Sequence, residues 1–153
     1  MTATTSARVA VRQRLFEYLT ERVLDMPPGS VTYASPIDTI GDDAIWLGEI
    51  KAADSGLEDP RKPGRQVRND AFTIDIIIVA VAAGDADGQG SDARAIELLA
   101  AVENIVAEDV TLGAVPGLIF CKLAPFDGPS PQPTDLGYAS IITAPLFCST
   151  QLR

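Results

Sequence analysis

Apolar residues return every three or four positions in two stretches of the chain, and this spacing predicts two helices. The first is expected from Ser6, its N-cap, to about Asp25, and the second from about Asp92 to Glu108. Ser91 or Asp92 is the expected N-cap of the second helix. The residues expected to face inward are Val11, Leu15, Tyr18, Leu19, Val23 and Met26 in the first helix, and Ile96, Leu99, Val102 and Val106, flanked by Leu98 and Ile105, in the second.

A period of two predicts the strongest strand at Asn69–Val81. One face of this strand is wholly apolar and must be buried. Its other face begins polar at Thr73 and Asp75 and ends apolar, so we expect a helix to cover half of it. Pro145 cannot donate to a ladder, which predicts that the last strand is an edge or is bulged there. The apolar face comprises Phe72, Ile74, Ile76 and Ile78, and the other predicted strands are Val31–Ser35, Ala44–Ile50, Leu118–Ala124 and Tyr138–Cys148.

These elements predict one domain over residues 1–153, because no internal repeat or boundary interrupts them. The order is α-β-β-arm-β-α-β-β, with turns or connections at 36–43, 84–91 and 125–137. Consecutive hairpins indicate an α+β fold with a mostly antiparallel sheet of about five strands and two main helices packed on it.

The segment 51–68 is polar and broken by Pro and Gly, so we expect it to extend from the domain as an arm. Four of the 12 basic residues of the chain lie in it. A solvated loop would explain this run, but so would an arm that docks on an acidic neighbour, namely a second copy of the same chain. Four charges would bind DNA only weakly at physiological salt. The four residues are Arg61, Lys62, Arg65 and Arg68.

The composition of the chain excludes several kinds of catalytic and binding site. The chain has no histidine, which removes the usual nucleophile pairs and imidazole metal ligands. A net charge of −9 argues against a nucleic-acid-binding surface. The longest apolar run, 76–83, is too short to cross a bilayer. Cys121 and Cys148 lie in apolar strands and are expected as small buried hydrophobes in a chain made in a reducing cytoplasm. We therefore expect no enzyme, no metal and no cofactor.

Three local features could carry chemistry. The segment 85–90 follows the first places of an EF-hand loop, but the twelfth place is Ile96, which cannot supply the bidentate ligand. Asp75 would be a general acid only if it were buried, and an exposed sheet position is the simpler interpretation. Trp46 is more often a core residue than a ligand platform.

Short phrases of the sequence resemble the tail terminator proteins of long-tailed (siphovirus-like) bacteriophages. The phrases are 45–49, 72–76 and 108–113, the last read as Glu-Asp-Val-Thr-Leu-Gly after an amphipathic helix. Members of this family often carry two glycines after that leucine, whereas here Ala114 follows Gly113. We treat Leu112 and Gly113 as a structural turn in which Gly113 takes a positive φ.

The resemblance implies a virion protein at the head-proximal end of the tail, made in the host cytoplasm. Such a subunit forms a six-membered homo-oligomeric ring that caps the tail tube protein, stops tube polymerisation and joins the head–tail connector. DNA passes through the lumen without specific binding. Three alternatives remain open: a head-completion or neck adaptor protein, a cytoplasmic small-molecule-binding α+β domain, and a carboxylate-dependent hydrolase.

Reversal of the arm charges tests the predicted arm. The variant with Arg61→Glu, Lys62→Glu and Arg65→Glu is expected to assemble poorly and to keep its fold, because the arm contributes attraction to a neighbour and no core. Sedimentation and circular dichroism measure the two properties. Unchanged ring formation in this variant would refute the proposed role of the arm.

Overall fold

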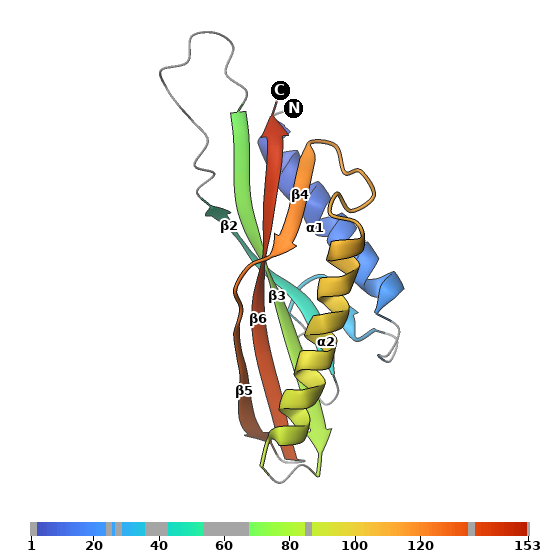
Figure 1. The fold of residues 1–153 in the computed structure, drawn as a ribbon, viewed down its shortest axis with the longest axis vertical. Helices are drawn as coiled ribbons and strands as arrows, with labels where there is room; N and C mark the ends of the chain where they lie inside the picture. Colours follow the sequence, from blue (N-terminus) through green and yellow to red (C-terminus); the bar gives the residue numbers. More distant parts are fainter. Residues whose placement is uncertain are drawn as a thin grey trace.

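Two helices pack on one face of a six-stranded sheet in the computed structural model, which describes residues 3–23, 26, 29–35, 43–53, 68–84, 87–134 and 137–152. Figure 1 shows the molecule as elongated, with the two longest strands side by side along its axis and both helices beside them. The helices are α1 (Ala3–Arg22) and α2 (Gln89–Glu108). The strands are β1 (Val31–Thr32), β2 (Ala44–Ala53), β3 (Arg68–Ala83), β4 (Leu118–Leu123), β5 (Asp127–Thr134) and β6 (Gly137–Leu152).

The sheet is built around the pairing of β3 with β6. These strands are 16 residues each and are antiparallel from Arg68 opposite Leu152 to Ala83 opposite Gly137. β2 pairs with the other edge of β3, and β1 adds to β2 in parallel. Beyond β6, its C-terminal half pairs with β4 and its N-terminal half with β5. The predicted α+β class and mostly antiparallel sheet are confirmed.

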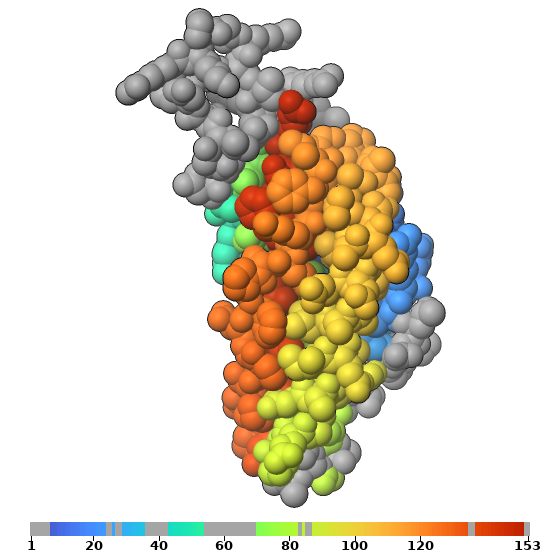
Figure 2. All heavy atoms as spheres, viewed as in Figure 1, coloured from blue at the N-terminus to red at the C-terminus, as the bar shows by residue number. Residues whose placement is uncertain are grey.

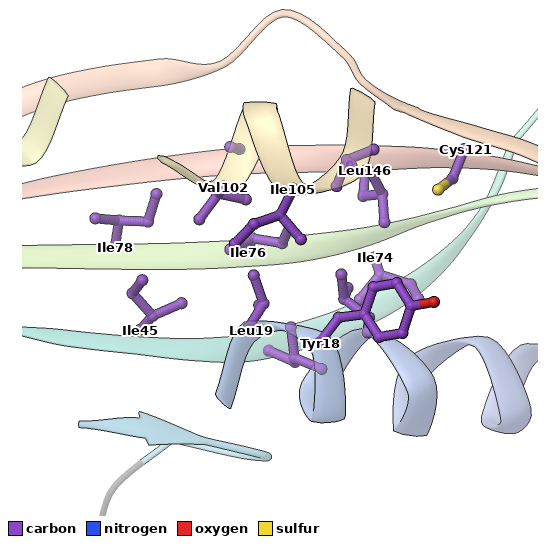
Figure 3. Close-up of a cluster of buried hydrophobic side chains, with 14 of the residues drawn as sticks. Tyr18, Leu19, Ile45, Ile74, Ile76, Ile78, Val102, Ile105, Cys121 and Leu146 are labelled. Atoms are coloured by element: carbon purple, nitrogen blue, oxygen red, sulfur yellow. The ribbon is translucent and has the colours of Figure 1, made fainter. Parts of the chain in front are cut away.

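The core lies between both helices and one face of the sheet. Figure 3 shows Leu19 of α1, Val102 and Ile105 of α2, and Ile76 and Ile78 of β3 in one cluster. The predicted apolar face of β3 is confirmed, because Phe72, Ile74, Ile76 and Ile78 are fully buried. Each such side chain contributes about 1.5–3 kcal/mol by leaving water. This face therefore fixes on which side of the sheet the helices lie.

Two side-chain contacts fix α1 on the sheet. The guanidinium of Arg8 donates to both carboxylate oxygens of Asp70 on β3, at 2.9 and 3.0 Å. Arg12 donates to the carbonyl of Leu47 on β2 at 3.3 Å. An arginine that binds a carboxylate with two parallel bonds restricts the angle of approach as well as the distance. These contacts orient α1 as well as hold it against the sheet.

The predicted helix boundaries were partly wrong. Ser6 lies inside α1 rather than at its start. The N-cap of α2 is Gly88, in a left-handed conformation with φ 87° and without a side-chain cap. Ser91 is instead buried and shares a 2.7 Å hydrogen bond with Ser140, whose hydroxyl donates to Asp92 at 2.5 Å. The residues taken as caps therefore join the first turn of α2 to β6.

Two predictions about strands were also incomplete. The connection predicted at 125–137 contains β5, so the sheet has six strands in the described residues instead of about five. Its prolines concealed it, since proline is depleted in strands. The first predicted strand shrinks to Val31–Thr32.

Pro145 lies in a central strand, contrary to the prediction of an edge or a bulge. It stands opposite Asp75 in an unbroken register between β3 and β6. Its carbonyl accepts from the N–H of Ala124 at 2.8 Å, so its ring nitrogen also faces the side of β6 on which β4 and β5 lie. That point falls between the end of β4 at Leu123 and the start of β5 at Asp127, where no ladder donor is required. The gap between two partner strands accommodates the proline.

Candidate assembly surfaces

The basic arm falls largely outside the described residues. Arg61, Lys62 and Arg65 lie there, and Arg68 is described only as the first residue of β3. The arm therefore stays a sequence prediction. The surfaces that the structure does describe are the second face of the sheet, the outer face of α2, the edges of the sheet and the turn after α2.

No helix of the described residues covers the second face of the sheet, which we call the open face. The predicted helix over half of this face is wrong, because both helices pack on the opposite side. Positions that share a face follow from the strand register. Near the middle of the open face, Trp46, Ile77 and Thr143 lie in one cross-strand row, and Val79 and Ile141 form the next. Trp46 is half-buried on this face and is not a core residue.

The open face continues toward β4 as a row that combines lysines and an aromatic ring. Lys51, Thr73, Phe147 and Lys122 are consecutive partners across β2, β3, β6 and β4. The two lysines are thus three strand spacings apart, about 14 Å. Phe147 also packs against Phe120, with ring centroids 5.9 Å apart. The open face is therefore a mixed surface, apolar around Trp46, Ile77 and Phe147, with a lysine on each side.

Asp75 lies on this face with a partner that the sequence did not reveal. The ammonium of Lys51 is 3.2 Å from its carboxylate, and the Asp75 side chain is 15% exposed. This contact raises the pKa of Lys51. The pair belongs to neighbouring strands, so only the register brings the two residues together. Asp75 is therefore a half-buried, ion-paired residue, and the predicted exposed position is wrong.

The second surface is the outer face of α2, which Figure 2 shows exposed along the length of the helix. Ile96 is 43% exposed here, although its spacing had placed it against the sheet. Val110, just beyond the helix, is 42% exposed. The face combines small and apolar residues with carboxylates. Its exposed members are Ala93, Ile96, Glu97, Ala100, Glu103, Asn104, Ala107, Glu108 and Val110.

Two edges of the sheet are closed to strand addition. Pro131 and Pro133 have no N–H, so the β5 residues that donate to β6 are those that alternate with them. The backbone nitrogens of the two prolines therefore face away from β6. On the edge of β4, the N–H of Cys121 already donates to the carbonyl of Val110 at 2.8 Å. A neighbour that extended either edge would find few free donors. On the side of β4 and β5, a face is therefore better suited than an edge to contact another subunit.

The turn after α2 is organised by the carboxylate of Asp109. It accepts hydrogen bonds from the Tyr18 hydroxyl at 2.9 Å, from the Gly113 N–H at 2.8 Å, and from both the N–H and the hydroxyl of Thr111. These donors lower the pKa of Asp109, with Tyr18 as the largest cause, and the same contact raises the pKa of Tyr18. Asp109 thus ties α1 to the end of α2.

Three consecutive residues of this turn have a left-handed backbone. The φ values are 49° at Leu112, 73° at Gly113 and 61° at Ala114. A Cβ on Gly113 would lie 2.6 Å from the Tyr18 hydroxyl and 2.7 Å from a guanidinium nitrogen of Arg14. Leu112 is fully buried, so the turn delivers a core side chain from an unusual backbone.

The described residues show no further chemical centre. Cys121 and Cys148 are free, buried and directly opposite each other on β4 and β6. Burial raises the pKa of Cys121 to about 12 and raises that of Cys148 as well. The described part of the chain contains no cluster of His, Cys, Asp or Glu that could hold a metal ion. Of the EF-hand-like segment, Asp85 lies outside the described residues, and Asp87 accepts from the N–H of Gln89. Neither described helix has the length and apolar character needed to cross a membrane.

Comparison with known proteins identifies the fold and no family. No family model matches the sequence, and no curated protein matches it. A chain of the solved structure "Virion of native gene transfer agent (GTA) particle" superposes with a TM-score of 0.62 and 14% sequence identity. The match covers 95% of this chain and 97% of that one. The two chains share a fold.

Substitutions in the turn test its backbone. Gly113→Ala combines left-handed strain with a clash against Tyr18, so we expect a loss of stability of about 2 kcal/mol or more. Gly84→Ala is the matched control, because Gly84 also has a positive φ but a Cβ there meets nothing within 4 Å. Ala114→Gly should relieve strain and raise the midpoint of thermal unfolding. Equal losses at Gly113 and Gly84 would contradict the clash.

The lowered pKa of Asp109 predicts a pH dependence of stability. Its ionised form is favoured in the folded state, so the contribution is complete above the unfolded pKa near 4 and is lost as pH falls through the lower folded pKa. Asp109→Asn is expected to be less stable than the wild type at pH 6, and the difference should shrink toward pH 2. Urea unfolding across this range measures it. A difference that does not vary with pH would contradict the assignment.

Proposed function

We propose that this chain is a structural subunit of a phage-like virion that acts as a tail terminator. In this role it forms a six-membered ring on the last ring of the tail tube, stops polymerisation and offers a surface to the head–tail connector. The supporting observation is the fold shared with a chain of a virion particle, which spans nearly the whole length of both chains. The sequence resemblance supplies the specific role.

The described surfaces support a protein that works by assembly. A ring subunit needs two different faces that can meet those of its neighbours, since head-to-tail contacts of this kind close into rings. The open face and the outer face of α2 lie on opposite sides of the layered domain. The edges formed by β4 and β5 are closed to strand addition, which favours contact through faces.

The charge of the chain supports the proposed passage of DNA. Each copy carries −9, so a ring of six copies would surround its lumen with a strongly negative potential. Phosphate groups would be repelled by such a wall, and DNA would pass without binding.

The proposed function is tested with purified tail tube protein. Tubes polymerised in the presence of this chain should be shorter and should carry a ring at one end, as seen by electron microscopy. The variant with Arg61→Glu, Lys62→Glu and Arg65→Glu serves as a comparison, because it should shorten tubes less at the same concentration. A control with Glu17→Lys and Glu21→Lys changes exposed charges on α1 and should act as the wild type does.

Other outcomes would assign a different role. Tubes that grow to normal length, together with binding of the chain to the connector, would identify a neck adaptor instead. A lone subunit that binds a small molecule and neither tube nor connector would overturn the proposal in favour of a binding domain.

A further inference from the structure

We propose that the open face of one subunit packs against the outer face of α2 of a second copy. The inference rests on the proposed ring, and it names the two surfaces that form each contact. The occupant of the open face is thus a second copy of this chain, docked through its helix.

The open face is suited to receive a helix. Its row of Trp46 and Ile77 is apolar and half-buried, and Ile141 on the next row is 39% exposed. The opposite face of the same sheet already packs two helices. A helix on the open face would complete a third layer, which is a common way to bury the second face of a sheet. The strands of 16 residues are long enough, since a 20-residue helix spans about 30 Å.

The outer face of α2 offers a matching shape. Ala93, Ala100 and Ala107 recur every seven residues, so small side chains line its centre and allow close approach. Ile96 lies between them at 43% exposure and supplies an apolar side chain to the contact. An exposed isoleucine beside these alanines gains by burial against the row of Trp46 and Ile77.

Charge complementarity selects a helix of this kind as the occupant. The open face presents the exposed ammonium of Lys122, whereas Lys51 is already paired with Asp75 at 3.2 Å. The outer face of α2 presents the exposed carboxylates of Glu97, Glu103 and Glu108. Lys122 and these carboxylates would fix the orientation of the contact, while the apolar residues supply most of its free energy.

The positions of the two surfaces also allow repeated contacts to form a closed ring. The two surfaces are different and lie on opposite sides of the domain, so each subunit uses one toward each neighbour. Such a heterologous contact generates a ring when its rotation closes. A symmetric pairing of open face with open face would stop at two subunits.

Charge exchange between two variants tests the contact. The sheet variant carries Lys122→Glu, and the helix variant carries Glu103→Lys and Glu108→Lys. Lys51 is kept, because it pairs with Asp75 within the subunit. Each alone should form rings at least roughly tenfold more weakly than the wild type, because like charges then meet at every contact. An equimolar mixture should restore rings, since the two variants can alternate with opposite charges facing. The α1 control with Glu17→Lys and Glu21→Lys should assemble normally.

Cross-linking provides a second readout that does not depend on charge. The pair Ile96→Cys and Ile141→Cys should give covalent oligomers on mild oxidation, whereas Val9→Cys with Ile141→Cys should not. Val9 is 42% exposed and makes a matched control. The native Cys121 and Cys148 are fully buried, so they are not replaced in this experiment.

The outcomes separate the two proposals. If either charge variant alone forms rings as readily as the wild type does, this interface is wrong, although the proposed ring still stands. The same conclusion follows if the mixture of the two variants fails to assemble. Equal cross-linking of the control pair would overturn it as well. A wild-type chain that forms no ring, with or without tail tube protein, would overturn the proposed function itself.

Discussion

The pairing of β3 with β6 is the constraint on which the rest of the structure depends. This ladder is the only one that runs the full length of both strands in the described sheet, and every other strand except β1 pairs directly with one of the two. Its register decides which residues share a face. It places Phe72, Ile74, Ile76 and Ile78 under the helices and leaves Ile77 and Val79 on the open face. A slip of one residue would exchange the two faces and expose the core.

The sequence was sufficient where one physical rule decided the outcome. Alternation along β3 and helical spacing in α1 both reflect burial on a single side, so the core face and the fold class followed from them. Features that depend on pairing between distant residues did not follow. Predicting the Lys51–Asp75 contact requires the register of two strands. Predicting the position of Pro145 requires knowing that β4 ends and β5 begins beside it. Ile96 was misplaced because its spacing fits the buried side, while its exposure depends on where α2 sits on the sheet.

The candidate surfaces were harder to anticipate than the fold. The basic residues at 61–68 are conspicuous in the sequence because they are clustered in an acidic chain. The open face has no such local signal. Trp46, Ile77 and Phe147 come from three strands and look like ordinary core residues until the helices are seen to occupy the other side. The turn at Asp109 was recognised as a turn, but its tie to Tyr18 joins residues 91 positions apart.

The outward prolines of β5 have a consequence for the way in which copies of this chain can accumulate. Hydrogen-bonded extension from strand to strand has no natural end, and it underlies the fibres that many exposed sheet edges produce. Pro131 and Pro133 withhold the donors that such growth needs along this edge. Copies of this chain would thereby be protected from open-ended aggregation along β5.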